Sequence, residues 1–554
     1  MADTFGIDLG TTYSCLAKFE NGKPVVIQAE QGVRNSLASA VYFGPDGETV
    51  VGDDAKAYVQ TEGHRVIQFI KREIGKPALP HEIDGRSYNA IEISALILKK
   101  IVKYAAEQGE IVKDVVITCP AYFGNEERDA TKKAGQLAGL NVLELINEPT
   151  AAAISYALGE AGGTVKDENV VVYDLGGGTF DVTVLEIKAK SNGVPSCTVL
   201  ATDGDDKLGG KDWDMLLFSL IKDKMMSENG LDELSMDDEN AIRAIVEKTK
   251  HKLSVTQSAD VRCHIAGSSM TCTVTREEFE TVSAGLLKQT TDCLDRILAL
   301  PKLANVRIDK ILLVGGSSNM PMVKNTIAER YGSAAKLAAI RGLSAPAVDS
   351  PVDVGLKDAE CAVCKGAAIY ANLLKKAKKN TGGFMFGDED EAPAIEVQDI
   401  ASRTFGVDVN DNSVDDGIKL DNLIYKGDKI PASITKTYYP VVDNQRGVLF
   451  YIYESNITDR YGYFPLNVPK GAETGDPIDP DPAWGLKYLG KLFLKFPPGV
   501  TKETALPTTM SVSGSGIHVR VENSITGDVQ EVDIEFTNNE VDMDNNHINA
   551  LFIE

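Results

Sequence analysis

Hydrophobic and polar residues alternate in two different patterns along the chain. From residue 4 to about residue 378, short apolar runs alternate with longer stretches whose apolar positions recur every three or four residues. "DVVITCP" followed by "GNEERDATKKAGQLAGL" is one such pair of a strand and a helix. The helical stretch "AIRAIVEKTKHKL" carries its apolar side chains on one stripe, at Ile242, Ile245, Val246 and Leu253. The alternation predicts an α/β domain with covered sheets over residues 1–380.

A different pattern begins after a break in composition. Residues 375–399 pass from a basic helix end through Gly-Gly to an acidic, proline-containing stretch, which is typical of an exposed linker. We place this linker at 381–400. Beyond it, "VLFYIYE", "LFLKF", "IHVRVEN" and "EVDIEF" are short alternating segments separated by turn residues. They predict an all-β sandwich within residues 401–554.

Composition excludes some classes of function. The 554 residues include 57 Lys and Arg against 81 Asp and Glu, and the resulting net charge of -24 opposes direct binding to nucleic acid. The 8 cysteines are scattered, as in proteins of a reducing compartment. The N-terminus lacks a leader pattern, and no run of about 18 apolar residues occurs. We therefore expect a cytoplasmic protein that does not enter membranes.

Two cysteines form a single CxxC motif in "CAVCKGAAIYANLL", an Ala-rich helical pattern. Zinc takes four ligands, and a second cysteine pair is missing. We therefore expect Cys361 and Cys364 to pack a helix rather than to bind a metal ion.

An internal repeat suggests where the chemistry lies. "FGIDLGTTYSCLAKF" and "VYDLGGGTFDVTVLEI" share the scheme strand, Asp-Leu-Gly, small and hydroxyl residues, strand. Their aspartates, Asp8 and Asp174, are 174 - 8 = 166 residues apart. Two equivalent hairpins predict two related subdomains that face each other across a cleft.

The residue types of these hairpins suit a polyphosphate and a magnesium ion. Glycine allows positive φ angles and lets an anion approach the backbone N–H groups, so Gly176, Gly177 and Gly178 suit phosphate binding. Asp8 and Asp174 would supply hard oxygen ligands to a hydrated Mg²⁺. Hydroxyl donors follow at Thr11, Thr12 and Thr179. The alternative is a pair of hairpins that merely turn tightly.

Two further motifs are ambiguous by themselves. Glu148 in "NEPTAAAISYAL" precedes a proline that can open a helix, so its acid group has either a catalytic role or a favourable interaction with the helix dipole. "ILLVGGSSNMPMV" is a buried strand that ends in Gly315 and Gly316, where a helix N-terminus could meet ribose or adenine.

Together these fragments resemble one family. "GIDLGTTYS", "KREIGK", "NEPTAAA", "DLGGGTFDV", "LGGKDWD" and "VGGSS" occur in the order of the nucleotide-binding domain of heat-shock protein 70 (DnaK-type) chaperones, within the actin and sugar-kinase superfamily. The similarity continues through "GDKIPASITKT" and "DNQRGVLFYIYE". It implies a two-lobed, actin-like ATPase domain built on a ribonuclease-H-like duplication, followed by a β-sandwich substrate-binding domain.

The resemblance also assigns roles to residues. It implies that Asp8 and Asp174 hold Mg²⁺ through water molecules. Lys71, Glu148 and Asp181 would act on the γ-phosphate and the attacking water, in phosphoryl transfer by positioning and charge neutralisation. The positions implied to contact ATP or ADP are Gly10, Thr11, Thr12, Tyr13, Gly176, Gly177, Gly178, Thr179, Glu247, Lys250, Ser254, Gly315, Gly316 and Ser317.

Several positions depart from the family pattern. His251 and Asn319 replace two arginines that usually enclose the adenine, and Lys211 reverses a charge in "DKLGGKD". The linker stretch "PAIEVQDIAS" lacks the family's leucine run, so we expect weak coupling between the domains. The sequence ends soon after the β region, so we expect a truncated β domain and no helical lid.

These departures resemble an atypical subfamily, the Hsp70-like subunit of the fungal ribosome-associated complex. That resemblance implies a stable pair with a zuotin-type J-domain protein, contact with the ribosome through that partner, and help to a second Hsp70 that acts on nascent polypeptides. ATP would be bound with slow or no hydrolysis. The alternatives are an active ATPase chaperone with its own peptide clients and a small-molecule kinase of the same superfamily.

Overall fold

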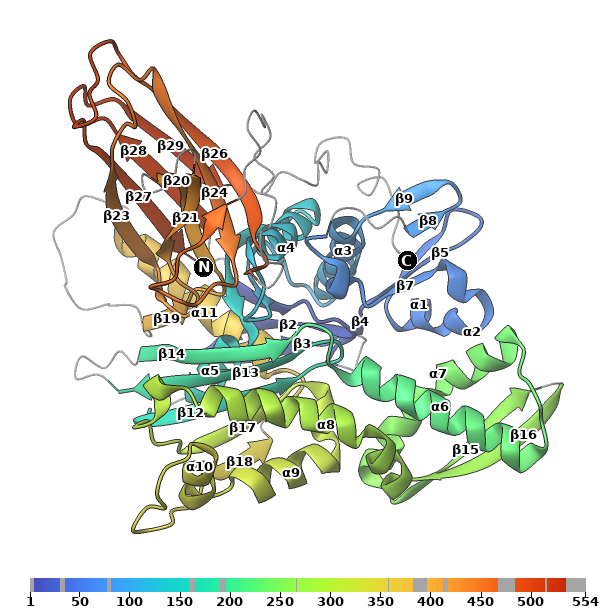
Figure 1. Ribbon diagram of the computed structural model, residues 1–554. Coiled ribbons are helices and arrows are strands. Elements are labelled where there is room, and N and C mark those ends of the chain that lie inside the picture. Colours follow the sequence, from blue (N-terminus) through green and yellow to red (C-terminus); the bar gives the residue numbers. More distant parts are fainter. Residues whose placement is uncertain are drawn as a thin grey trace. The chain divides into compact units, whose positions relative to one another are not determined.

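The computed structural model describes residues 4–29, 35–76, 81–158, 165–189, 196–265, 267–356, 358–381, 396–411, 417–466, 484–513 and 516–534. They divide into two compact units (Figure 1). The first comprises the described parts of Met1–Tyr122 and Ala130–Val397, and the second those of Phe123–Asp129 and Gln398–Asn539. No helix in these ranges is long and apolar enough to cross a membrane.

Two mixed β-sheets with the same strand order form the centre of the first unit. Their strands are β1 (Thr4–Asp8), β2 (Tyr13–Glu20), β3 (Lys23–Ile27), β4 (Leu37–Ala38), β10 (Asp114–Cys119), β11 (Asn141–Asn147), β12 (Glu168–Leu175), β13 (Phe180–Lys188), β14 (Ser196–Asp205), β17 (Lys310–Val314) and β18 (Asp353–Leu356). One sheet has the order β11-β10-β1-β2-β3, and the other includes β18-β17-β12-β13-β14. In both, the first hairpin strand pairs antiparallel with the next strand and parallel with a later one. The hairpin repeat in the sequence thus corresponds to a repeated sheet topology.

Two helices lie between these sheets. α5 (Glu148–Leu158) and α11 (Ala362–Thr381) contact each other, while α11 covers β1 and β2 and α5 covers β12 and β13. Small residues allow the close approach: a side-chain carbon at Gly366 would lie 1.7 Å from the Ala151 carbonyl oxygen. A carbon at Gly6 would lie 2.1 Å from the backbone nitrogen of Ala368. The position of α11 on β1 is therefore sterically fixed.

The remaining elements belong to the first unit, except that the first five residues of α4 belong to the second. They are β5 (Ala40–Phe43), β6 (Thr49–Val51), β7 (Val66–Gln68), β8 (His81–Ile83), β9 (Arg86–Tyr88), β15 (Ser258–Ile265), β16 (Ser268–Thr275), α1 (Asp53–Ala57), α2 (Val59–Glu62), α3 (Ala90–Glu107), α4 (Asn125–Leu137), α6 (Gly210–Asn229), α7 (Met236–Val255), α8 (Arg276–Leu298), α9 (Pro321–Tyr331), α10 (Ala334–Ile340), η1 (Gly63–Arg65), η2 (Ile70–Glu73), η3 (Pro301–Leu303) and η4 (Gly316–Asn319). The predicted β10, α4 and α7 are present at the expected places. Apolar side chains of α6, α7 and α8 join those of β12 and β13 in one core that includes Trp213 and Tyr173.

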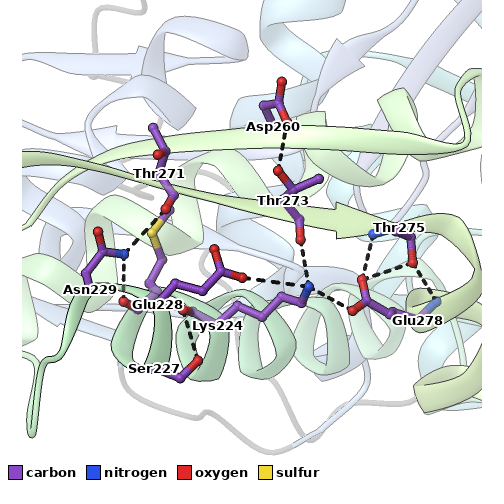
Figure 2. A network of polar contacts seen from close by, with 10 residues as sticks. Lys224, Ser227, Glu228, Asn229, Asp260, Thr271, Thr273, Thr275 and Glu278 are labelled. Carbon is purple, nitrogen blue, oxygen red and sulfur yellow. Dashed lines mark hydrogen bonds and ion pairs between the residues drawn. The ribbon is translucent and has the colours of Figure 1, made fainter.

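A polar network fastens the end of α6 to the β15–β16 hairpin (Figure 2). Lys224 Nζ donates to the carbonyl oxygen of Thr273 (2.7 Å) and pairs with Glu278 (2.7 Å). Glu278 also accepts hydrogen bonds from the backbone N–H and hydroxyl of Thr275, which caps α8. One lysine therefore connects a helix, a strand and the start of a second helix.

The second unit is β-rich, as the sequence predicts. Its strands include β20 (Thr404–Asp411), β21 (Gly417–Ile424), β22 (Lys429–Ile430), β23 (Ala432–Tyr438), β24 (Gly447–Ser455), β25 (Pro465–Leu466), β26 (Lys487–Lys495), β27 (Leu506–Ser513), β28 (Gly516–Glu522) and β29 (Val529–Ile534). All of these strands except β22 form the sheets β25-β21-β20-β24-β26 and β23-β27-β28-β29 around one apolar core.

The expected linker lies mostly outside the described residues, at 382–395. Its last five residues form β19 (Glu396–Ile400), and Asp399 and Ile400 of this strand pair antiparallel with β22. This pairing joins segments about 30 residues apart, which local composition does not reveal.

Candidate functional site

The turns of the β1–β2 and β12–β13 hairpins lie against each other. A side-chain carbon at Gly177 would lie 1.9 Å from Thr12 Oγ1, and one at Gly178 would lie 2.3 Å from Thr11 Cγ2. Separations this short exclude any side chain, so both positions require glycine. The structure thus brings the two sequence repeats together at their turns.

The physical reason for the glycine run differs from the one inferred from the sequence. Glycine permits positive φ angles, but none of Gly176, Gly177 and Gly178 has one. Other segments of the same chain pack against the turn instead. A side-chain carbon at Gly209 would lie 2.5 Å from the backbone nitrogen of Gly178, and Ser317 Oγ donates to the Gly176 carbonyl oxygen (2.9 Å). Close contact with the protein itself accounts for glycine at positions 177 and 178, whereas a side-chain carbon at Gly176 would lie 3.4 Å from the Thr179 carbonyl oxygen, an ordinary contact. Contact with phosphate stays a prediction.

Five charged side chains gather beside these turns. Lys71 of η2 forms an ion pair with Glu148, the first residue of α5, and both side chains are buried. Asp174 and Asp181 occupy opposed positions in β12 and β13 and are also buried. Asp8 ends β1 and accepts a hydrogen bond from the Thr118 hydroxyl (3.3 Å). These are the predicted metal-binding and catalytic residues.

Burial and mutual repulsion shift the protonation of these acids. Burial and the charge of Glu148 raise the pKa of Asp8 to about 7, although Lys71 opposes the shift. Burial and Glu148 also raise the pKa values of Asp174 and Asp181 well above the usual range. Burial disfavours the charged lysine, but Glu148 and Asp8 outweigh it and raise the pKa of Lys71. The cluster therefore holds more carboxylates than one lysine can neutralise.

One carboxylate oxygen in the cluster has the environment of a cation ligand. Asp181 Oδ1 accepts a hydrogen bond from the backbone N–H of Ala121 (3.0 Å), whereas Oδ2 is buried without a hydrogen-bond partner among the described residues. Such an oxygen is costly to bury unless a cation or a donor faces it. With Asp8 and Asp174 in the same cluster, these oxygens fit a hydrated Mg²⁺, which takes few protein ligands.

Arg72 is a residue that sequence reasoning missed. Its Nε donates to the carbonyl oxygen of Gly178 (2.8 Å), and its guanidinium pairs with Asp212 in the first turn of α6 (2.6 Å). Asp212 in turn accepts a hydrogen bond from the backbone N–H of Gly209 (2.8 Å). Arg72 thereby fixes both the glycine turn and the segment that encloses it. It lies in the quoted motif "KREIGK", which was the only available signal.

A second connection runs through the predicted adenine side of the site. Lys56 of α1 forms an ion pair with Glu247 of α7 and donates to the hydroxyl of Tyr13 (3.1 Å). Lys250, one turn after Glu247, pairs with Asp214 of α6 (2.8 Å). Tyr13, Glu247 and Lys250 are thus placed by contacts between elements distant in sequence. Lys56 carries no sequence motif that indicates this role.

The other predicted positions differ in how closely they join the turns. Gly10 accepts a hydrogen bond from the Ser39 hydroxyl at its carbonyl oxygen (2.8 Å), and the backbone N–H of Gly176 donates to the Thr179 carbonyl oxygen (3.0 Å). Gly315 has a φ of 80, and a side-chain carbon there would lie 2.6 Å from Asp174 Oδ1. Two positions stand apart from these contacts: Gly316 is exposed, and the Ser254 hydroxyl donates to the Lys250 carbonyl oxygen of its own helix (3.1 Å).

Comparison with known families identifies the family to which this chain belongs. A family model described as Hsp70 protein matches residues 4–461. The chain belongs to the Hsp70 family. Hsp70 proteins are chaperones that bind ATP or ADP with Mg²⁺. The match includes every candidate site residue and extends into the β-rich second unit, which a small-molecule kinase would leave unexplained.

Within this Hsp70 chain, the positions that depart from the family pattern have different surroundings. His251 on α7 and Asn319 in η4 are both exposed, and Asn319 Nδ2 donates to the Gly316 carbonyl oxygen (3.0 Å). Lys211 is half-buried, with its Nζ 4.5 Å from the ring centroid of Phe69. Burial and the nearby Arg72 lower the pKa of Lys211. Lys211, in the first turn of α6, therefore contacts Phe69, the residue that directly precedes η2.

Proposed function

We propose that this Hsp70 chain binds ATP or ADP with Mg²⁺ at the facing hairpins and hydrolyses ATP slowly or not at all. The observation that carries the proposal is the cluster of four carboxylates around Lys71, with one carboxylate oxygen of Asp181 buried without a partner among the described residues. A divalent cation would stabilise the ionised form of these acids.

The position of each residue in the cluster suggests its role. Bound Mg²⁺ would neutralise charge on the phosphates and hold their geometry. Asp8 and Asp174, at matching places in the two repeats, would accept hydrogen bonds from its water molecules. Lys71 Nζ would direct its charge at the terminal phosphate, while Glu148 and Asp181 would orient a water molecule. Hydroxyl and N–H donors to the phosphates would come from Gly10, Thr11, Thr12, Gly176, Gly177, Gly178 and Thr179.

Two features favour slow hydrolysis. Lys71 is already paired with Glu148, so contact with a phosphate requires it to share or exchange this partner. His251 and Asn319 lack the planar, permanently charged group with which arginine stacks on a base. The nucleotide would therefore be held mainly at its phosphates and through Tyr13, Glu247 and Lys250.

A single-turnover assay tests the hydrolytic part. Purified protein is loaded with labelled ATP, and the rate of ADP formation is compared with that of Lys71→Ala, after equal loading has been established. We expect the two rates to be indistinguishable. Rapid hydrolysis that is lost in Lys71→Ala would overturn slow turnover and support the second candidate, an active ATPase chaperone. That candidate is favoured by the complete set Lys71, Glu148 and Asp181.

We further propose that the chain is a regulatory subunit that pairs with a zuotin-type J-domain protein, reaches the ribosome through it, and assists a second Hsp70 on nascent polypeptides in the cytoplasm. The resemblance of the departing positions to that subfamily supports the proposal. The net charge of -24 is compatible with a division in which a basic partner contacts ribosomal RNA.

Co-purification from cell extract, followed by mass spectrometry, tests this partnership. We expect one J-domain protein at stoichiometric yield, and ribosomal proteins only while that partner is present. Recovery of many peptide clients without a stoichiometric J-domain protein would contradict the regulatory role and favour an independent chaperone cycle.

A further inference from the structure

Three cysteine thiols converge behind the first hairpin. Cys15 lies on β2, Cys361 lies directly before α11, and Cys364 lies in the first turn of that helix. Their sulfur atoms all lie within 4.8 Å of one another, and each residue is at most 3% exposed. The CxxC motif by itself predicted only helix packing. The third thiol comes from a position 361 - 15 = 346 residues away, which no local motif could indicate.

We propose that Cys15, Cys361 and Cys364 form a binding site for a soft, thiophilic metal ion, Cu(I). Three sulfur ligands about 2.3 Å from one ion stand about 4 Å from each other, so the observed separation requires little movement. A disulfide requires about 2 Å between two sulfurs and would leave the third thiol unused. The geometry therefore suits the coordination of one ion by all three sulfurs better than a disulfide between two of them.

The number and kind of ligands select the ion. Thiolates favour Cu(I), Zn²⁺ and iron–sulfur clusters. Zinc sites take four ligands, and among the described residues no His, Asp, Glu or fourth Cys joins this group. Because the three side chains are buried, solvent does not supply the missing ligand. A soft ion that accepts three ligands, such as Cu(I), matches the three buried sulfur ligands of this site.

The scaffold holds the ligands before the ion arrives. α11 is fixed on β1, since a side-chain carbon at Gly6 would lie 2.5 Å from the Cys364 carbonyl oxygen. Cys15 is held in β2 by its pairing with Asp8 of β1. Sites carried by a helix and a strand lose little freedom on binding.

Charge at the site also favours metal binding. Coordination forms sulfur–metal bonds, and each thiol that becomes a thiolate releases its proton to solvent. Cys361 and Cys364 lie at the N-terminus of α11, a 20-residue helix whose dipole stabilises negative charge there.

The test is a Cu(I) titration of the full chain under anaerobic, reducing conditions, in competition with a colorimetric Cu(I) chelator and without nucleotide. We expect one Cu(I) per chain. Cys15→Ser and Cys364→Ser should each weaken the affinity by more than about 100-fold, because a direct ligand is lost rather than an outer partner. Cys197 is a buried cysteine of β14, so Cys197→Ser is the matched control and should bind Cu(I) as the wild type does.

Circular dichroism establishes that each variant is folded, and X-ray absorption at the copper edge counts the sulfur neighbours of the ion. Three sulfurs support the proposal. Failure of the wild type to take Cu(I) from the chelator, unchanged binding by folded Cys15→Ser, or preference for Zn²⁺ over Cu(I) would each overturn it. Nucleotide binding is not involved, so this result is independent of the proposed function.

Discussion

The carboxyl group of Asp8 has a pKa of about 7 in the folded chain, because burial and Glu148 raise it. In an unfolded chain, an aspartate titrates near 3.9. Between these values the native state binds more protons than the unfolded state, so the free energy of unfolding falls as the pH rises from about 4 to about 7. The loss is on the order of a few kcal/mol.

This linkage predicts a pH-dependent effect of Asp8→Asn, which cannot ionise. Relative to the wild type without ligand, we expect Asp8→Asn to be more stable at pH 7.5 and not at pH 4. Urea unfolding at both pH values measures the difference, with the exposed Asp46→Asn as a control that should behave alike at both. An equal effect of Asp8→Asn at the two pH values would contradict the assignment.

Arg72 provides a second prediction at this scale. Arg72→Ala removes one hydrogen bond to Gly178 and an ion pair with Asp212, so we expect a loss of about 2 kcal/mol in the free energy of unfolding. Arg72→Lys should recover less than half, because an ammonium group cannot make both contacts in the fork geometry. Lys288→Ala breaks an exposed helical pair with Asp292 and should cost no more than about 0.5 kcal/mol. Full recovery of the free energy of unfolding in Arg72→Lys would contradict this account, because it would show that the positive charge alone provides the stabilisation.

At the scale of elements, the contact between the two turns should not tolerate a side chain. Gly177→Ala places a carbon where Thr12 lies, so we expect a destabilisation of about 1–3 kcal/mol and weaker nucleotide binding. Gly285→Ala is the matched control, because this exposed glycine of α8 has no atom within 4 Å of the added carbon. That change should stabilise the protein by up to about 1 kcal/mol. Thermal unfolding compares the two, and equal behaviour would refute the steric account.

Elements with a strong local pattern were predictable from the sequence. The apolar periodicity of the sequence predicts β10, α4 and α7, and the two similar hairpin motifs indicate the repeated sheet topology. Residues placed by distant partners were not predictable. Arg72 contacts positions 106 and 140 residues away, and Lys56 pairs with Glu247, 191 residues away. The sequence predicts an approach of phosphate to the glycine turn, which stays a prediction, whereas the contacts of Gly177 and Gly178 with Thr12 and Thr11 are visible only in the fold.

At the scale of the whole molecule, membership of the Hsp70 family explains why an α/β unit and a β-rich unit occur in one chain. The first unit repeats a sheet topology, and the two copies each place an aspartate, Asp8 or Asp174, at the shared cluster. A duplicated scaffold thus supplies two similar acid groups to one cluster of charged side chains.

The central claim is that the facing hairpins hold a magnesium nucleotide, and calorimetric titration of the nucleotide-stripped full chain tests it most directly. We expect ATP and ADP each to bind once per chain with Mg²⁺, and much more weakly when the metal is chelated or when Asp174 is changed to Asn. Absence of binding by either nucleotide in the presence of Mg²⁺ would contradict the account.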